Sequence, residues 1–226
     1  MLKTIFVETT TTGVYGTPDF SINEGFNILN KDPIPFHNLG GSWYHISKSN
    51  DCNYLWLANR LWGLTIIDFR TAITLGLNTS ETKLSKKFLN RFDYEFNFGV
   101  VANKFIIKSI HNKKIEIYGK GKQKKPFIDL QDAVDSLFNV INFKRNKKFN
   151  VFNQFSETIS ITEITNWIKE IQKKHHKKVK VVHVVNPRVE NETHQMTMKN
   201  NKFKKILRRK PKSIKQSITD TYNTIV

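Results

Sequence analysis

Residues 64–70 form a short, almost continuous apolar run directly after a segment with helical periodicity. The run, Leu-Thr-Ile-Ile-Asp-Phe-Arg, is typical of a strand buried on both faces of a sheet. Residues 44–62 precede it and end before Gly63, a residue that commonly stops a helix. Their apolar residues recur at helical spacing: Tyr54, Leu57, Ala58 and Leu61. A helix that leads into a fully buried strand is typical of a parallel sheet.

The rest of the chain continues to alternate between the two periodicities. Further strands are predicted at residues 2–9, 114–118, 149–153 and 178–185. Further helices are predicted at residues 94–110, 129–141 and 162–175, the last with Thr162 as its N-cap, and residues 78–87 form a polar loop. Strands separated by helices indicate the α/β class with a parallel sheet.

The charge of the chain is strongly positive. Its 226 residues carry 37 Lys and Arg against 19 Asp and Glu, a net charge of +18. Such a charge attracts nucleic acid, acidic membranes or phosphorylated ligands. The lysines concentrate in residues 144–148, 173–180 and 202–215, without the interleaved aromatic residues of a base-stacking surface. A solvated lysine-rich surface is therefore favoured, and a nucleic-acid-binding protein is the least favoured function.

The cysteine content and the hydropathy of the chain limit the cellular compartments in which we expect the protein. The only cysteine is Cys52, which excludes an intrachain disulfide and zinc-finger spacing, so we expect a reducing compartment and no metal site. No apolar run approaches the ~18 residues that cross a bilayer, and residues 1–7 are too short for a signal peptide. We expect a soluble, intracellular protein without a membrane span, in the cytoplasm or an organelle.

Tyr44 and Lys48 form the pattern Tyr-x-x-x-Lys. Four residues apart on a helix, a phenol and an ammonium lie on one face, and a nearby cation lowers the pKa of a phenol, which helps it to move an alcohol proton. Tyr118 and Lys122 show the same spacing, but Gly119 and Gly121 favour a turn there. Tyr44 begins an amphipathic segment after a glycine-containing loop, which favours the first pair.

Several motifs together resemble the extended short-chain dehydrogenase/reductases that act on nucleotide sugars, and among them the UDP-sulfoquinovose synthase family. They keep their order from about residue 2 to about residue 200. The motifs are Thr-Thr-Gly-Val-Tyr-Gly-Thr-Pro at 11–18, Tyr-His-Ile-Ser-Lys at 44–48, Asn-Arg-Phe-Asp-Tyr at 90–94, Ile-Tyr-Gly-Lys-Gly at 117–121, Val-Phe-Asn-Gln-Phe at 151–155 and Asn-Pro-Arg-Val-Glu at 186–190 with His194 nearby.

The resemblance implies a Rossmann sheet that holds NAD and a C-terminal part that holds a UDP-sugar. No three glycines fit the family's Gly-x-x-Gly-x-x-Gly fingerprint, so the first strands of the sheet would be missing from this sequence. The chain would then be one half of a split protein, with a separate N-terminal NAD-binding half, or the product of a truncated reading frame. The expected divisions are 1–76 as the Rossmann part with the active site, 77–200 as the nucleotide-sugar part and 201–226 as a basic helical tail. A homodimer partner is a further alternative.

The resemblance also assigns roles to single residues. Tyr44 would be the general base, Lys48 its activator and ribose partner, Thr11 the hydroxyl that orders the sugar alcohol, and His45 a candidate acid or base or else a histidine packed at the helix start. Tyr44, Lys48 and Arg70 would contact the cofactor. Thr11 and five further residues would contact the substrate: Asn103, Lys125, Asn153, Gln154 and Arg188. After the position of Gly121 the family usually has an arginine, whereas this chain has Lys122, Lys124 and Lys125. A lysine cannot make the bidentate phosphate contact of an arginine, so that contact becomes at best a point charge.

Three functions stay open on the sequence. One is a nucleotide-sugar enzyme present in part, either of the sulfoquinovose synthase type or another epimerase or dehydratase. The second is an inactive remnant that binds a partner or a sugar nucleotide. The third is a nucleic-acid-binding protein on this scaffold.

Overall fold

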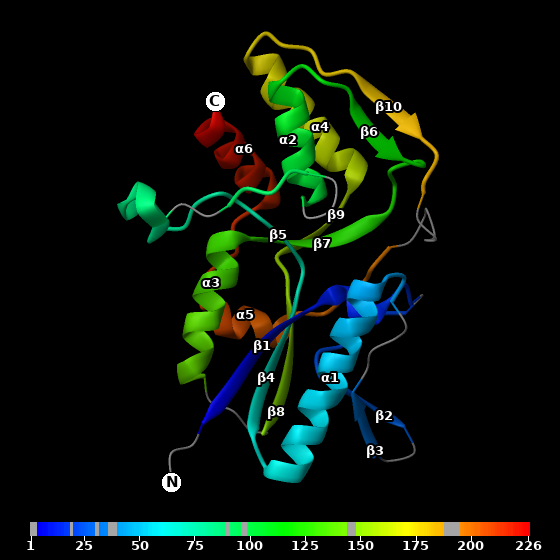
Figure 1. Cartoon of the computed structure of the whole chain (residues 1–226), viewed down its shortest axis with the longest axis vertical. Coiled ribbons are helices and arrows are strands. Elements are labelled where there is room, and N and C mark those ends of the chain that lie inside the picture. Colours follow the sequence, from blue (N-terminus) through cyan, green and yellow to red (C-terminus); the bar gives the residue numbers. More distant parts are fainter. Residues whose placement is uncertain are drawn as a thin grey trace. The chain divides into compact units, whose positions relative to one another are not determined.

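The computed structural model describes residues 4–18, 20–29, 32–35, 40–88, 91–95, 99–143, 148–187 and 195–226 (Figure 1). The chain divides into two compact units, each assembled from separate stretches of sequence. Unit 1 comprises Met1–Ala72, Ala133–Phe155 and Met196–Lys210. Unit 2 comprises Ile73–Asp132, Ser156–Gln195 and Pro211–Val226.

Unit 1 is built on a three-stranded parallel sheet in the order β1-β4-β8. The strands are β1 (Ile5–Thr11), β4 (Thr65–Thr71) and β8 (Phe149–Gln154), with Ile5 opposite Thr65 and Ile66 opposite Phe149. Residues 66–70 of β4 are all buried, as the apolar run predicts for a central strand. The predicted α/β class with a parallel sheet is confirmed.

Helix α1 (Trp43–Trp62) has clear local start and stop signals. The Ser42 side chain accepts a hydrogen bond from the His45 N–H at 3.2 Å, and Gly63 ends the helix in the left-handed conformation with φ 63°. Its inner side, with Leu55, Trp56 and Ala58, packs on buried residues of β4 and β8. The predicted helix is confirmed, although most of the apolar stripe that predicted it faces outward.

Shorter elements complete unit 1. They are the 3₁₀ turn η1 (Thr12–Tyr15), the antiparallel pair β2 (Phe26–Leu29) and β3 (Asp32–Pro35), α3 (Leu130–Asn139), which begins in unit 2, η4 (Val140–Asn142) and α5 (Asn201–Leu207). The Glu24 carboxylate joins β8 to α5 by accepting from the N–H groups of Asn153, Lys202 and Phe203 at 3.2, 2.7 and 3.0 Å. Figure 1 shows α1 and α3 on opposite sides of the sheet.

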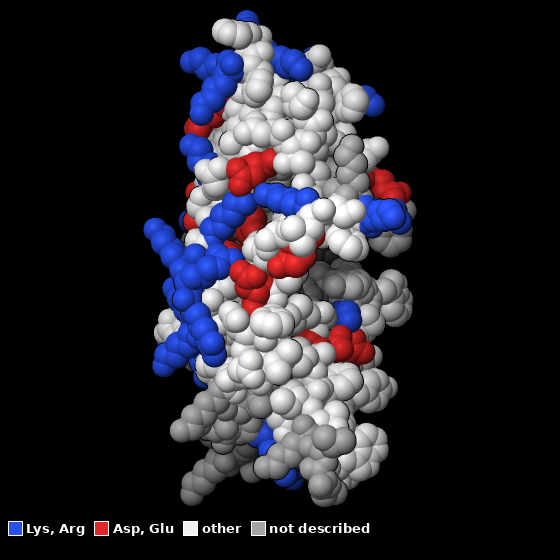
Figure 2. Space-filling view, turned by 90° about the vertical axis from the view of Figure 1, so that its left-hand side faces the viewer, with Lys and Arg blue, Asp and Glu red and all other residues white. Residues whose placement is uncertain are grey.

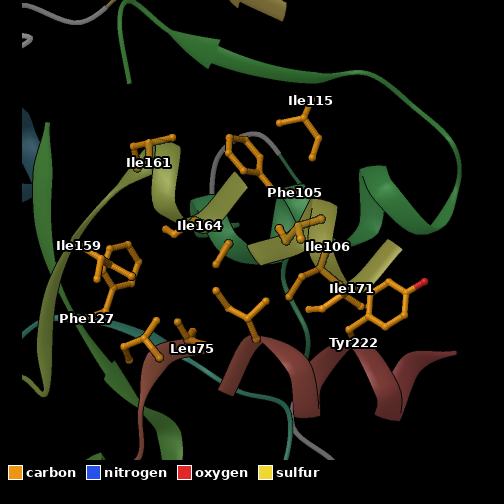
Figure 3. Packing of buried hydrophobic residues seen from close by; sticks show 14 of the residues in the cluster. Leu75, Phe105, Ile106, Ile115, Phe127, Ile159, Ile161, Ile164, Ile171 and Tyr222 are labelled. Carbon is orange, nitrogen blue, oxygen red and sulfur yellow. The ribbon is translucent and has the colours of Figure 1, made fainter. Parts of the chain in front are cut away.

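Unit 2 packs helices on two small sheets. One sheet has the order β5-β7-β9, from β5 (Ile73–Leu75), β7 (Lys124–Asp129) and β9 (Glu157–Ser160), and the other is the parallel pair β6 (Ile115–Tyr118) and β10 (Val181–Val184). The helices are α2 (Val101–Ile110), α4 (Ile161–Lys174) and α6 (Ile214–Ile225), with 3₁₀ turns η2 (Thr82–Leu84) and η3 (Lys86–Phe88). Figure 3 shows Phe105, Ile164 and Tyr222 of the three helices converging in one apolar core.

The structure corrects several local predictions. Helix α4 is capped by Ser160, whose hydroxyl accepts from the N–H of Glu163 in a capping box, while the Thr162 hydroxyl donates to the Gly121 carbonyl at 3.0 Å. Helix α2 begins at Val101, not at residue 94. Strands β5, β7 and β9 and the β2–β3 pair were not predicted, because they are short and, in β7, begin with polar residues and Pro126.

Residues 201–226, predicted as a basic helical tail, contain the helices α5 and α6. Helices α5 and α6 bury apolar residues while their basic side chains stay exposed, and the buried residues are Phe203, Ile206, Leu207, Ile214, Ile218 and Tyr222. Figure 2 shows basic side chains in several groups with acidic side chains between some of them. Among the described residues, no helix combines the length and the apolar character needed to cross a bilayer. The functional division at residues 76 and 200 stays a prediction.

Candidate active site

Thr11 lies at the carboxyl end of β1, where the chain turns into η1. Its hydroxyl oxygen accepts from the N–H of Gly13 at 3.1 Å, and the N–H of Gly16 donates to the Gly13 carbonyl at 3.2 Å. The turn is therefore fixed by its own hydrogen bonds. In open α/β sheets ligands bind outside the carboxyl ends of the strands, so Thr11 occupies the edge where a ligand is expected.

Tyr44 and Lys48 lie on the first turns of α1, which packs beside β1 and η1. Tyr44 is 57% exposed, so its phenol is open to a ligand. The Lys48 ammonium lies 3.2 Å from the Asp51 carboxylate and 3.6 Å from that of Glu8. Partial burial lowers the pKa of Lys48, but these carboxylates outweigh it and the pKa is raised. Lys48 therefore stays an ammonium at neutral pH.

His45 is packed between two glycines. Its ring centroid is 5.5 Å from that of Tyr44. A Cβ atom on Gly13 would lie 2.3 Å from the His45 ring, and one on Gly40 would lie 2.2 Å from the His45 Cβ. Only glycine permits this approach. The geometry favours the packed histidine of the two alternatives, and an acid or base role for His45 stays a prediction.

A buried polar cluster underlies the Thr11 turn. Arg70 and Asp68 have no exposed surface, and the Arg70 Nε lies 3.2 Å from Asp68 Oδ2. The Thr10 hydroxyl donates to Asp68 Oδ1 at 2.5 Å, and the Arg70 guanidinium carbon lies 4.6 Å from the centre of the Tyr15 ring. We call Thr10, Tyr15, Asp68 and Arg70 the buried charge cluster.

Two pKa values in the cluster are raised, by different causes. Burial raises the pKa of Tyr15 to about 12. Burial alone would lower the pKa of Arg70, but the Tyr15 oxygen and the Asp68 carboxylate raise it above its ordinary value. At neutral pH Tyr15 is therefore uncharged and Arg70 is a cation. The structure places Arg70 inside the buried charge cluster, where it pairs with Asp68. The predicted contact of Arg70 with a cofactor stays a prediction.

Asn153 and Gln154 are fully buried and internally bonded. Asn153 Oδ1 accepts from the Tyr15 hydroxyl at 2.5 Å and its Nδ2 donates to the Lys199 carbonyl at 2.9 Å. Gln154 Oε1 accepts from the Thr71 hydroxyl at 2.6 Å and its Nε2 donates to the Ser136 hydroxyl at 2.7 Å. Neither has exposed surface, so the predicted substrate contacts would require these bonds to open. Here the two amides hold β8 against its neighbours.

The remaining predicted substrate residues belong to unit 2 or fall outside the described residues. Asn103 lies on α2, where its side-chain amide donates to the Asp93 carbonyl at 3.0 Å. Its Oδ1 is buried and has no hydrogen-bond partner among the residues that the structure describes. Lys125 is half-buried on β7. Arg188 lies outside the described residues. The substrate roles of these three residues stay predictions.

Cys52 offers a test of the packing around the buried charge cluster. Its thiol is 1% exposed and donates to Asp68 Oδ2 at 3.6 Å, and burial raises its pKa to about 12. Because the thiolate is the reactive form, modification by a disulfide reagent at pH 8 should be at least ~10³-fold slower in the folded chain than in urea. The rate of modification, followed by the absorbance of the thiol that the reagent releases, would check this. Equal rates in both conditions would contradict the packing.

No family model matches the sequence. In sequence the chain is 31% identical over 216 residues to the chloroplastic UDP-sulfoquinovose synthase of Spinacia oleracea, a match that covers 93% of this chain and 45% of the relative. It is 35% identical over 132 residues to the UDP-sulfoquinovose synthase of Sulfolobus acidocaldarius, with 56% of this chain and 33% of the relative covered. The chain therefore spans less than half the length of these curated relatives.

Solved structures agree on the fold. The UDP-glucuronic acid 4-epimerase of Bacillus cereus, in complex with UDP-glucuronic acid and NAD, has a TM-score of 0.72 and 17% identity, covering 98% of this chain and 61% of the epimerase. The UDP-N-acetylglucosamine 4-epimerase of Methanobrevibacter ruminantium has a TM-score of 0.73 and 17% identity, covering 98% and 62%. In sequence the chain is thus similar to part of the UDP-sulfoquinovose synthases, and its fold is that of part of these two epimerases.

Proposed function

We propose that this chain supplies the sugar-oxidising residues of an NAD-dependent nucleotide-sugar enzyme of the UDP-sulfoquinovose synthase type. One observation carries the proposal. An exposed phenol, Tyr44, and a charged Lys48 one helical turn later lie on a helix packed beside the strand that ends in Thr11. In a relative of the sulfoquinovose synthases, this arrangement provides a base, its activating cation and an orienting hydroxyl.

The roles of these residues follow from their chemistry. Thr11 would donate to or accept from the sugar C4 hydroxyl, Tyr44 would take its proton, and Lys48 would be the activating cation beside Tyr44. Bound NAD would supply the hydride acceptor. A C4 ketone acidifies the C5 hydrogen, which permits loss of water across C5 and C6, addition of sulfite at C6 and return of the hydride. UDP-glucose and sulfite would then give UDP-sulfoquinovose and water.

The activity is proposed for a protein that contains both this chain and an NAD-binding segment. Hydride transfer requires the nicotinamide in contact with the sugar C4, and the glycine fingerprint that holds the cofactor pyrophosphate does not occur in this sequence. The chain alone is therefore expected neither to bind NAD tightly nor to turn over UDP-glucose. Calorimetry on the isolated chain tests this, and micromolar NAD binding would contradict it.

Tyr44→Phe tests the active-site assignment. In a chimera of this chain with the segment of the spinach relative that lies outside the match, the substitution should lower turnover by about 10²–10⁴-fold, because the proton acceptor is lost. The measurement is formation of UDP-sulfoquinovose from UDP-glucose and sulfite. Tyr118→Phe is the matched control, since Tyr118 and Lys122 share the same spacing on unit 2. Equal activity of both variants would contradict the assignment of Tyr44 as the proton acceptor.

The same assay separates the alternatives. A product that forms without sulfite, with inversion at C4, would identify another epimerase of the superfamily. Binding of UDP-glucose without turnover in the chimera would support an inactive sugar-nucleotide-binding remnant.

A further inference from the structure

Helices α2 and α4 end in turns with the same sequence pattern. Residues 111–114 are His-Asn-Lys-Lys, and residues 175–178 are His-His-Lys-Lys. In each turn the first residue is the C-cap of its helix, and the second is left-handed, with φ 55° at Asn112 and 56° at His176. Each turn therefore ends its helix and redirects the chain in the same way.

The hydrogen bonds of the two turns also correspond. The N–H of Lys113 donates to the Lys108 carbonyl at 2.8 Å, and the N–H of Lys177 donates to the Gln172 carbonyl at 2.9 Å. Bonds that reach back five residues in this way are typical of the Schellman motif. Because these N–H groups are bonded within the turns, a ligand would meet the side chains.

The fold of unit 2 brings the two turns together. Residues 111–114 lead directly into β6, and residues 175–180 lead into β10. The two strands are parallel neighbours, with Ile115 opposite Val181. The N–H of Ile115 donates to the Lys180 carbonyl at 2.8 Å, and Figure 1 shows both turns at one end of the unit. Neighbouring strands lie about 5 Å apart, so the two turns share one surface. We call residues 111–114 and 175–180 the paired basic turns.

The paired basic turns contain no acidic residue, and all their residues except Val179 are exposed. Their lysines are Lys113, Lys114, Lys177, Lys178 and Lys180. Lys114 lies 3.2 Å from the Glu116 carboxylate, and within the described part of the chain no ion pair joins the other four to an acid. Lysines in the last turn of a helix, such as Lys173 and Lys174, stabilise its carbonyl end. The lysines of the paired basic turns lie beyond the last turn, where this effect falls off.

We propose that the paired basic turns bind the phosphate backbone of a nucleic acid without preference for its base sequence. Lysine contacts to phosphates position a nucleic acid but do not read its sequence. The turns contain no Phe, Tyr or Trp that could stack on bases. An anionic bilayer is the weaker fit, because binding in its interface gains from apolar side chains that enter the lipid. The large exposed hydrophobic residues of the described chain all lie outside the paired basic turns.

The proposal depends on the fold, not on the lysine content alone. In the sequence, residues 173–180 are one of several basic segments, and a solvated surface is favoured for them. The pairing of β6 with β10 adds residues 111–114 to the same surface. Affinity for a nucleic acid rises with the number of phosphates that cations neutralise, so two adjacent turns bind more tightly than either alone. The surface includes none of the residues assigned to the nucleotide-sugar reaction.

Fluorescence anisotropy of a labelled DNA duplex of about 20 base pairs, titrated with the chain, tests the proposal. With about four phosphate contacts, the logarithm of the association constant should fall with the logarithm of the salt concentration with a slope of about −3 to −4. Lys113→Gln combined with Lys178→Gln removes one lysine from each turn. This double variant should weaken binding at least about tenfold and make the slope shallower by about two units.

A matched control separates the local surface from the net charge. Lys204→Gln combined with Lys205→Gln removes the same charge from exposed positions of α5 in unit 1, and it should leave affinity and slope nearly unchanged. Lysine acetylation of the unchanged chain, read by mass spectrometry, needs no variant. The duplex should protect Lys113, Lys177 and Lys178 from acetylation and leave Lys204 reactive.

Four results would overturn the proposal. They are equal weakening by both double variants, affinities that differ between duplexes of unlike sequence, acetylation of the paired basic turns that the duplex does not slow, and failure of the chain to bind the duplex while it binds vesicles of phosphatidylcholine and phosphatidylserine in equal parts. A duplex of RNA distinguishes the source of the phosphates, and equal binding of DNA and RNA supports recognition of the backbone alone. None of these assays contains NAD or a UDP-sugar, so this proposal and the proposed function can fail separately.

Discussion

Asp68→Ala is expected to destabilise unit 1 by about 3–5 kcal/mol, because it leaves the Arg70 guanidinium buried without its counter-charge. Both side chains are fully buried, with Arg70 Nε 3.2 Å from Asp68 Oδ2. The substitution also leaves the Thr10 hydroxyl without its acceptor. Urea unfolding followed by tryptophan fluorescence measures the effect through the midpoint and slope.

A double-mutant cycle separates lost charge pairing from lost packing. Asp68→Ala combined with Arg70→Met should be less destabilised than Asp68→Ala alone, because no unpaired charge then remains buried. Asp51→Ala is the control, since Asp51 pairs with Lys48 on the surface at 43% side-chain exposure and should cost at most about 1 kcal/mol. If Asp51→Ala and Asp68→Ala had equal effects, the buried charge cluster would not stabilise this unit as described.

Gly13→Ala is expected to displace the Thr11 turn and to lower both stability and chimera activity. The new Cβ would lie 2.3 Å from the His45 ring, so the turn or the start of α1 must move. Overpacking of this kind costs about 1–3 kcal/mol. A shift of about 1 Å between Thr11 and Tyr44 would cost roughly 10²-fold in turnover. Denaturation and product formation measure the two effects.

Removal of the His45 ring tests whether the clash with the new Cβ at position 13 causes the loss of stability. Gly13→Ala combined with His45→Ala should recover most of the stability, because the ring that meets the new Cβ is gone. Gly63→Ala is the control: its φ is 63°, which costs about 1 kcal/mol, but the nearest atom to its Cβ is Lys148 Nζ at 3.4 Å. It should therefore leave chimera activity unchanged. Failure of the double variant to recover would contradict the packing of His45 against Gly13.

Much of the framework could be predicted because its signals are local. The buried run at residues 64–70 and the helix at 44–62 depend on short-range periodicity and caps, and both are present as β4 and α1. The motifs around Thr11 and Tyr44 indicated the relatives that the comparisons found. The short strands β5, β7 and β9 could not be predicted, because their pairing partners are distant in sequence and their own residues do not alternate clearly.

The sequence by itself determined the α/β class, the main strand and helix of unit 1 and the Thr11, Tyr44 and Lys48 hypothesis. Only the tertiary structure showed that Arg70 is enclosed with Asp68 and Tyr15, since these contacts join residues such as Thr10 and Asp68 that are 58 positions apart. It also showed that Leu57 and Leu61 line an open groove. Periodicity identifies an apolar face of a helix, but which atoms cover that face depends on the elements that fold beside it.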